Sequence, residues 1–286
     1  MKYSGPLKIQ KISRSTKRLT THAKRYAADE DGIFSMRGQW IKEGNDCLLK
    51  ESKNRFNDYN NLALFNISLG DIQEVAFHNE KECKTHLYLG ALYKLFACRY
   101  YSLCEFEGKE RSACEVNLRA LAYFEAAVIA GANDVAQSLG KMLVSVDQSS
   151  IPLNVQKTDS IIIHLFNGDD AKVAEHCRFV KEHQNTLWTC KSMLEEIELY
   201  EAILAGDNQR FYDGFILSLR ANRRDPNLVW FLDLLHLALG KIAVQRGFEL
   251  PIDTEDCPQH LLQPEHCDYN SVTAQAPVEG FPWEEY

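Results

Sequence analysis

The sequence has no proline between Pro6 and Pro152. Because proline interrupts helices, a stretch of this length rich in Leu, Ala, Tyr and Phe indicates a series of helices. The chain also lacks an apolar run of the ~18 residues that a membrane helix needs, and no apolar segment of the secretory type follows its basic N-terminus. We therefore expect an all-α protein that is cytoplasmic and has no membrane contact.

Common catalytic motifs are absent as well. The sequence contains no phosphate-binding glycine loop, no nucleophile elbow and no H-E-x-x-H zinc helix. His176-Cys177 begins like an H-C-x5-R phosphatase loop, but His183 stands at the arginine position. The nine cysteines are odd in number and form no C-x-x-C pair, which is typical of free thiols in a reducing compartment. We expect a protein that is not an enzyme and binds no cofactor.

One cluster has the residue types of a metal site. Cys257, His260, His266 and Cys267 supply two thiolates and two imidazoles, the ligand set of many zinc sites. Adjacent His266 and Cys267 do not have the usual ligand spacing, so a polar tail with incidental His and Cys is the simpler interpretation. We expect no bound metal.

Asp233 and His236 lie one turn apart in a strongly apolar segment, 228–246, that we expect to be helical. A buried carboxylate beside an imidazole can act as an acid/base pair. It is more often a hydrogen-bonded pair within a core, and we favour that interpretation. The same helix should bury Phe231, Leu235 and Leu239.

Glycine followed closely by Asp or Asn recurs along the chain. Gly131, Gly168 and Gly206 lie 37 and 38 residues apart, the length of a helical hairpin, and Gly70 should end a helix over 55–69. The spacing predicts antiparallel helical hairpins stacked in an α-solenoid-like single domain.

Charge is distributed unevenly. The net charge is −8, yet residues 1–28 carry eight Lys or Arg and no Asp or Glu, whereas residues 251–286 carry eight Asp or Glu and no Lys or Arg. We divide the chain into a basic segment (1–28), a helical domain (29–262) and an acidic tail (263–286). An acidic body repels nucleic acid and suits a basic protein partner.

Residues 198–262 carry the most specific signal. Their features are the A-x-x-A-G-D step at 202–207, the L-x-L-x-K-x-A-x-x-R-G run ending at Gly247, the L-P-I-D segment at 250–253 and C-P-x-x-L-L at 257–262. This succession resembles the C-terminal half of the immunity protein 49 family of bacterial polymorphic-toxin systems. Cys257 departs from the aromatic or aliphatic residue usual there.

The resemblance implies a stoichiometric inhibitor that binds a cognate secreted antibacterial toxin, encoded upstream, and occludes it. Acidic residues are then candidate toxin contacts: Glu195, Glu198, Glu255 and Asp256. The alternative is a helical scaffold or an enzyme that uses Asp233 and His236, or the Cys257/His260/His266/Cys267 cluster.

Overall fold

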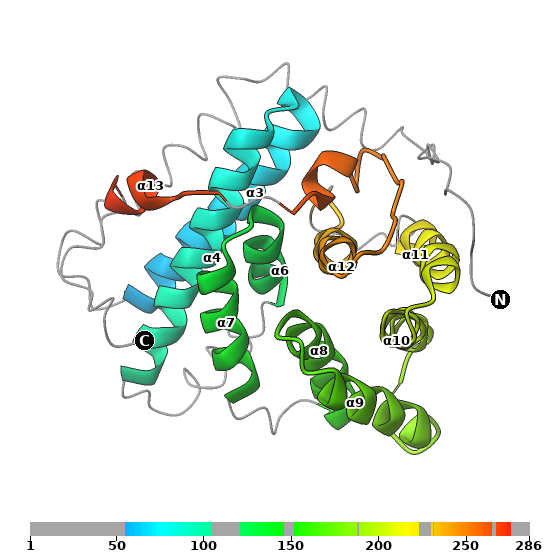
Figure 1. Cartoon of the computed structure of the whole chain (residues 1–286). Coiled ribbons are helices and arrows are strands. Elements are labelled where there is room, and N and C mark those ends of the chain that lie inside the picture. Colours follow the sequence, from blue (N-terminus) through cyan, green and yellow to red (C-terminus); the bar gives the residue numbers. More distant parts are fainter. Residues whose placement is uncertain are drawn as a thin grey trace. The chain divides into compact units, whose positions relative to one another are not determined.

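The computed structural model describes residues 55–103, 121–145, 152–187, 189–222, 230, 232–264 and 267–275. In this part of the chain every regular element is helical, and β-pairing is confined to isolated bridges in residues 252–257, among them one between Thr254 and Cys257. The all-α prediction is thus confirmed (Figure 1). The basic segment 1–28 lies outside the described residues. The helices are α3 (Arg55–Phe77), α4 (Glu80–Leu103), α6 (Leu121–Ala130), α7 (Asn133–Ser145), α8 (Leu153–Phe166), α9 (Asp170–His183), α10 (Lys191–Leu204), α11 (Asn208–Asn222), α12 (Leu234–Gln245), the 3-10 helix η2 (Gln259–Leu262) and α13 (Asn270–Gln275).

The described helices form two compact units, a subdivision that the sequence analysis did not predict. One, the α8–α12 unit, also contains η2; the other, the α3–α7 unit, also contains α13 and residues 232–234. Asp71 of α3 accepts a 2.7 Å hydrogen bond from the backbone N–H of Leu232, which fixes that short segment to its unit. Among the described helices, none is both long and apolar enough to cross a lipid bilayer.

The α3–α7 unit is built on the α3/α4 hairpin. From the sequence we expected Gly70 to end a helix. This is wrong, because α3 continues through Gly70 to Phe77. Its role is close packing, because a Cβ there would lie 3.0 Å from the Cys83 carbonyl oxygen of α4. Gly90 of α4 is tighter still, since an added Cβ would lie 2.6 Å from Cδ1 of Ile67. Small residues at the contact let the two helix backbones approach closely.

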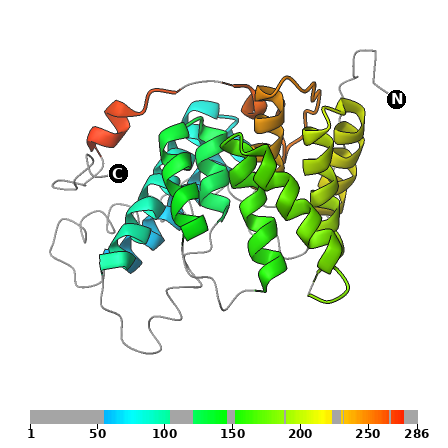
Figure 2. The same cartoon turned by 60° about the horizontal axis from the view of Figure 1, so that its bottom comes forward.

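The α8–α12 unit begins with an array of consecutive hairpins. Helix α8 packs on α9, α9 on α10 and α10 on α11, so each helix has its chain neighbours as spatial neighbours. Figures 1 and 2 show these helices side by side in sequence order. The predicted stacking of hairpins is therefore observed for residues 153–222.

The turns of these hairpins follow the predicted glycine pattern. Gly131, Gly168, Gly206 and Gly247 all have positive φ, between 64° and 87°, a conformation that side chains with a Cβ rarely adopt. Each lies in a C-terminal helix turn in which the next residue donates its N–H to the carbonyl five residues earlier, as in Ala132 to Ala127. This is the Schellman geometry, and it ends α6, α8, α10 and α12 in the same way.

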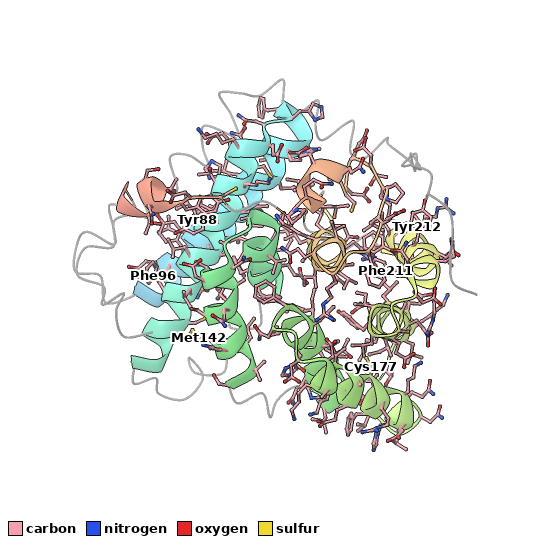
Figure 3. The ribbon with its side chains drawn as sticks, viewed as in Figure 1. Tyr88, Phe96, Met142, Cys177, Phe211 and Tyr212 are labelled. Carbon is pink, nitrogen blue, oxygen red and sulfur yellow. The ribbon has the colours of Figure 1, made fainter. Side chains whose placement is uncertain are left out.

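Residues 250–262 close the core of the α8–α12 unit. Gly240 of α12 lies so near this segment that an added Cβ would be 2.8 Å from Leu262 and 2.9 Å from Leu250. Phe211 of α11 packs against Phe248 with the rings edge to face, and Figure 3 shows it on the side of α11 toward α12. The L-P-I-D and C-P-x-x-L-L patterns are therefore packing motifs, and residues 250–252 form no regular strand.

Helix α12 differs from its prediction at the start. It begins at Leu234 rather than near residue 228, and residues 223–229 and 231 lie outside the described part. Leu239 is buried, at 1% exposure, as expected. Leu235 is only half-buried, so its predicted place in the core is wrong. Phe231 is not among the described residues.

Candidate functional site

The exposed side of α10 carries an ion-pair network that reaches three helices. Lys181 of α9 donates to Glu198 at 2.6 Å and to Glu201 at 2.7 Å, both on α10. Arg210 of α11 donates to Glu198 and, at 3.2 Å, to Glu201. Two cations and two carboxylates thus hold one another in place across α9, α10 and α11. We refer to these four residues as the charge network.

Electrostatics within the charge network favour the ionised forms. Hydrogen bonds from Lys181 and Arg210 lower the pKa of Glu198. Partial burial would lower the pKa of Lys181, but the hydrogen bonds to Glu198 and Glu201 outweigh it and raise that pKa. The ionised forms of Glu198 and Lys181 are thus stabilised by their contacts across the three helices.

Glu195, another predicted contact, also has a basic neighbour. Lys191 lies one turn earlier on α10, with its Nζ 3.2 Å from the Glu195 carboxylate. Three carboxylates on this face are therefore matched by three cations: Glu195, Glu198 and Glu201 by Lys181, Lys191 and Arg210. The side that the sequence presents as acidic is close to neutral, because two of its cations come from other helices.

The two residues of the second predicted acidic patch, Glu255 and Asp256, differ in their exposure to solvent. Glu255 is exposed, whereas Asp256 is fully buried at 0% exposure. The Asp256 carboxylate accepts a 2.6 Å hydrogen bond from the Thr254 hydroxyl and so shapes the turn before Cys257. Asp256 is therefore not accessible at the surface, whereas Glu255 is, and the role of Glu255 in toxin binding stays a prediction.

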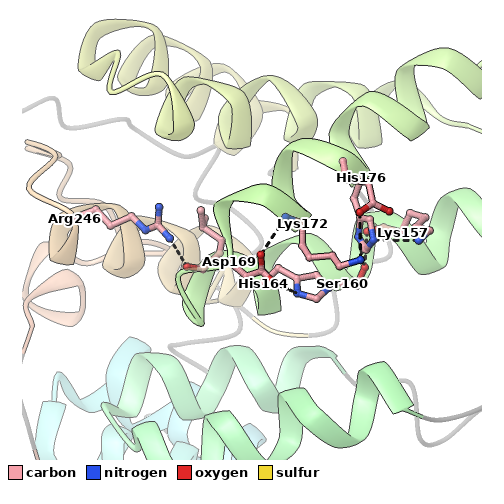
Figure 4. A network of polar contacts seen from close by, with 9 residues as sticks. Lys157, Ser160, His164, Asp169, Lys172, His176 and Arg246 are labelled. Carbon is pink, nitrogen blue, oxygen red and sulfur yellow. Dashed lines mark hydrogen bonds and ion pairs between the residues drawn. The ribbon is translucent and has the colours of Figure 1, made fainter.

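A polar relay that the sequence analysis missed joins α8 to α9 (Figure 4). Nζ of Lys157 lies 3.0 Å from Nε2 of His176, and Oγ of Ser160 lies 2.9 Å from the Nδ1 of the same ring. Ser160 also donates a 2.8 Å hydrogen bond to the Lys157 carbonyl. Lys157 and Ser160 are three residues apart and share one side of α8, which is the only trace of the relay in the sequence.

Each hydrogen bond of this relay has one possible donor. A charged lysine has no lone pair to accept with, so Nε2 of His176 must accept from it. Nδ1 then carries the proton and donates to Ser160, whose own proton goes to the Lys157 carbonyl. Partial burial, then the Lys157 charge, lower the pKa of His176 to about 4. This neutral imidazole presents no lone pair to the serine hydroxyl, so the arrangement orders α8 against α9 and does not activate Ser160 as a nucleophile.

Further polar contacts surround the α8–α9 turn. Asp169 caps α9 by accepting from the backbone N–H of Lys172 at 3.2 Å. Arg246, the residue that follows α12 (labelled in Figure 4), donates to Asp170 at 2.8 Å and to the Leu165 carbonyl at 2.6 Å. The Leu165 carbonyl at the end of α8, which also accepts from the Gly168 N–H at 3.2 Å, thereby gains a charged donor, so the arginine of the L-x-L-x-K-x-A-x-x-R-G run has a structural role.

Asp233 and His236 are both buried. Asp233 directly precedes α12, and His236 lies in its first turn. The His236 ring meets Phe215 of α11 edge to face, with ring centroids 5.0 Å apart. These contacts fit a core histidine, and the pairing with Asp233 stays a prediction.

The next two candidates are the metal cluster at residues 257–267 and a phosphatase-type nucleophile at Cys177. No three His, Cys, Asp or Glu side chains in the described ranges converge as metal ligands, and His266 lies outside them. Cys257 is buried in the closing segment. Burial raises the pKa of the Cys177 thiol to about 12, so the residue is not a thiolate nucleophile of the phosphatase kind.

Comparison with known proteins adds no relative: no family model, no curated protein and no solved structure matches this chain.

Proposed function

We propose that this protein is an immunity protein that binds one cognate antibacterial toxin domain and neutralises it by stoichiometric occlusion. Its partner is then a protein and its action needs no turnover. The proposal rests first on the resemblance of residues 198–262 to the immunity protein 49 family.

The observation that carries the proposal is the α8–α11 array with the charge network across it. Stacked hairpins of this kind present extended surfaces suited to protein partners. Lys181, Glu198, Glu201 and Arg210 are held in one geometry before any partner arrives. Because these side chains are already ordered, a partner that contacts them loses less conformational entropy on binding.

Because the charges on this face of α10 are balanced, long-range attraction would contribute little to toxin binding there. With its three carboxylates matched by cations, it would not strongly attract a basic toxin from a distance. We expect recognition through shape and local pairing, and a dissociation rate that depends on the network more than the association rate does.

The first test is growth rescue. The toxin encoded next to this gene is expressed with the wild-type protein, and cell growth and a one-to-one complex are measured. A Glu198→Lys variant leaves Lys181 and Arg210 facing a third cation, and we expect it to weaken the complex at least tenfold, largely through faster dissociation.

Lys172→Glu provides a matched control, because Lys172 is an exposed residue of α9 whose Nζ lies 3.2 Å from Glu175 on the same helix. It should leave the affinity unchanged. If the wild-type protein fails to protect cells and forms no complex with that toxin, the immunity function is wrong. If it protects but Glu198→Lys binds as the wild type does, the function stands and the charge network is not the contact.

A further inference from the structure

The C-terminal segment of the described chain is not a free polar tail. Residues 267–275, inside the segment we had assigned to an acidic tail, pack on the α3–α7 unit. Residues 267–269 have no regular secondary structure and are followed by α13, a helix of six residues. Figure 3 shows Tyr88 of α4 beside α13.

Two aromatic rings make the main contact. Tyr269 stacks on Tyr88 with the ring centroids 4.1 Å apart and the planes within 4° of parallel. The Tyr269 hydroxyl donates a 2.7 Å hydrogen bond to the carbonyl of Ala130, the last residue of α6. Carbonyls at the end of a helix have no acceptor role within it, so this contact satisfies a group that would otherwise need water.

Thr273 completes the contact through a hydrogen bond with the Tyr88 hydroxyl. Thr273 already donates its own proton to the Tyr269 carbonyl at 2.9 Å, so the Tyr88 hydroxyl is the donor to Thr273. The surface therefore recognises a tyrosine and a threonine four residues later, which lie on one side of a helical turn. Both halves of the surface belong to helices that are fixed by the rest of the unit.

The segment itself depends on this surface. An isolated helix of six residues is far below the ~12–15 residues at which helices become stable in water. Within the segment, Asp268 accepts from the Asn270 N–H at 2.9 Å, and the Tyr269 carbonyl accepts from both the backbone N–H of Thr273 at 2.8 Å and its hydroxyl at 2.9 Å. Its order thus comes from docking, as for a peptide that folds when it binds.

We propose that Tyr88 and the Ala130 carbonyl form a peptide-docking site for a short helical Tyr-x-x-x-Thr sequence, occupied here by the chain's own residues 269–273. The site belongs to the α3–α7 unit and shares no residue with the charge network of the α8–α12 unit. A peptide of the same chemistry supplied in trans would compete with the chain's own segment, which has the advantage of a high effective concentration.

The experiment uses the full chain and a fluorescent peptide of residues 265–278, under reducing conditions. In the Tyr269→Ala protein the cis segment is weakened and the site is open, so the wild-type peptide should bind saturably at one site. The wild-type protein should bind the peptide at least tenfold more weakly, because its own segment is in place. Circular dichroism checks that the variant remains folded.

Two matched changes identify the contacts. A peptide with Tyr269→Phe keeps the ring stack but loses the donor to Ala130, and we expect about tenfold weaker binding. Adding Tyr88→Phe to the Tyr269→Ala protein removes the donor to Thr273 and should weaken binding similarly. A folded Tyr269→Ala protein that does not bind the peptide, or that binds wild-type and Tyr269→Ala peptides equally, overturns the proposal.

Discussion

The relay between Lys157, His176 and Ser160 predicts an unusual titration. His176 should remain neutral far below the ordinary histidine pKa of 6.5, since its pKa is lowered to about 4. It should carry its proton on Nδ1, because Nε2 accepts from Lys157 at 3.0 Å. A nitrogen-detected NMR titration of the histidine rings reports both the pKa and the tautomer.

The same shift makes stability depend on pH. The unfolded chain takes up a proton near pH 6.5 but the folded chain only near pH 4, so stability falls as the pH drops between these values. If the whole pKa shift acted on stability, the free energy of unfolding would fall by about 2 kcal/mol between pH 7 and pH 5. Solvent screening of the partly exposed Lys157 reduces this loss to about 1 kcal/mol. Urea unfolding at the two pH values measures this loss.

Two variants isolate the cause. His176→Gln should remove about 1 kcal/mol of the pH dependence while other histidines still contribute theirs. Lys157→Met should raise the His176 pKa only part of the way to 6.5, because burial is the larger cause of the shift and remains. A His176 pKa above 6 in the wild-type protein, or a proton on Nε2, would refute the direction of the relay.

Three further predictions concern stability in urea unfolding. Gly206→Ala should cost about 1–2 kcal/mol, purely from its φ of 64°, because no atom lies within 4 Å of the added Cβ; no measurable loss would place its backbone elsewhere. Gly90→Ala should cost about 1–3 kcal/mol by overpacking against Ile67, and a neutral effect would mean that α3 and α4 are less tightly packed. Leu239→Ala should cost about 2–5 kcal/mol and half-buried Leu235→Ala clearly less, and the reverse order would contradict the orientation of α12.

Local signals in the sequence predicted local structure well. Gly131, Gly168 and Gly206 end helices because a positive φ is a property of the residue and its turn. Asp207, which directly follows Gly206, caps α11 by accepting from the Arg210 N–H at 3.1 Å. Gly70 was misjudged because its role depends on α4, a different helix, and nothing in its immediate neighbours reveals that contact.

The candidate sites were harder to predict for the same reason. The glutamates of α10 form an acidic run in the sequence, but Lys181 and Arg210 lie on the helices before and after it. The sequence indicates an exposed Asp256 beside Glu255, but in the structure Asp256 is buried in a turn where it accepts from the Thr254 hydroxyl. His176 lies 16 residues from Ser160, so their contact depends on the packing of α8 against α9.

The most direct test of the central proposal is a titration of the cognate toxin's activity with this protein. The immunity function predicts that activity falls linearly and reaches zero at one molecule of protein per molecule of toxin, with no further change over time. Loss of activity that continues at substoichiometric protein would mean turnover, and undiminished activity at excess protein would mean that this toxin is not its partner. Either result would contradict neutralisation by stoichiometric occlusion.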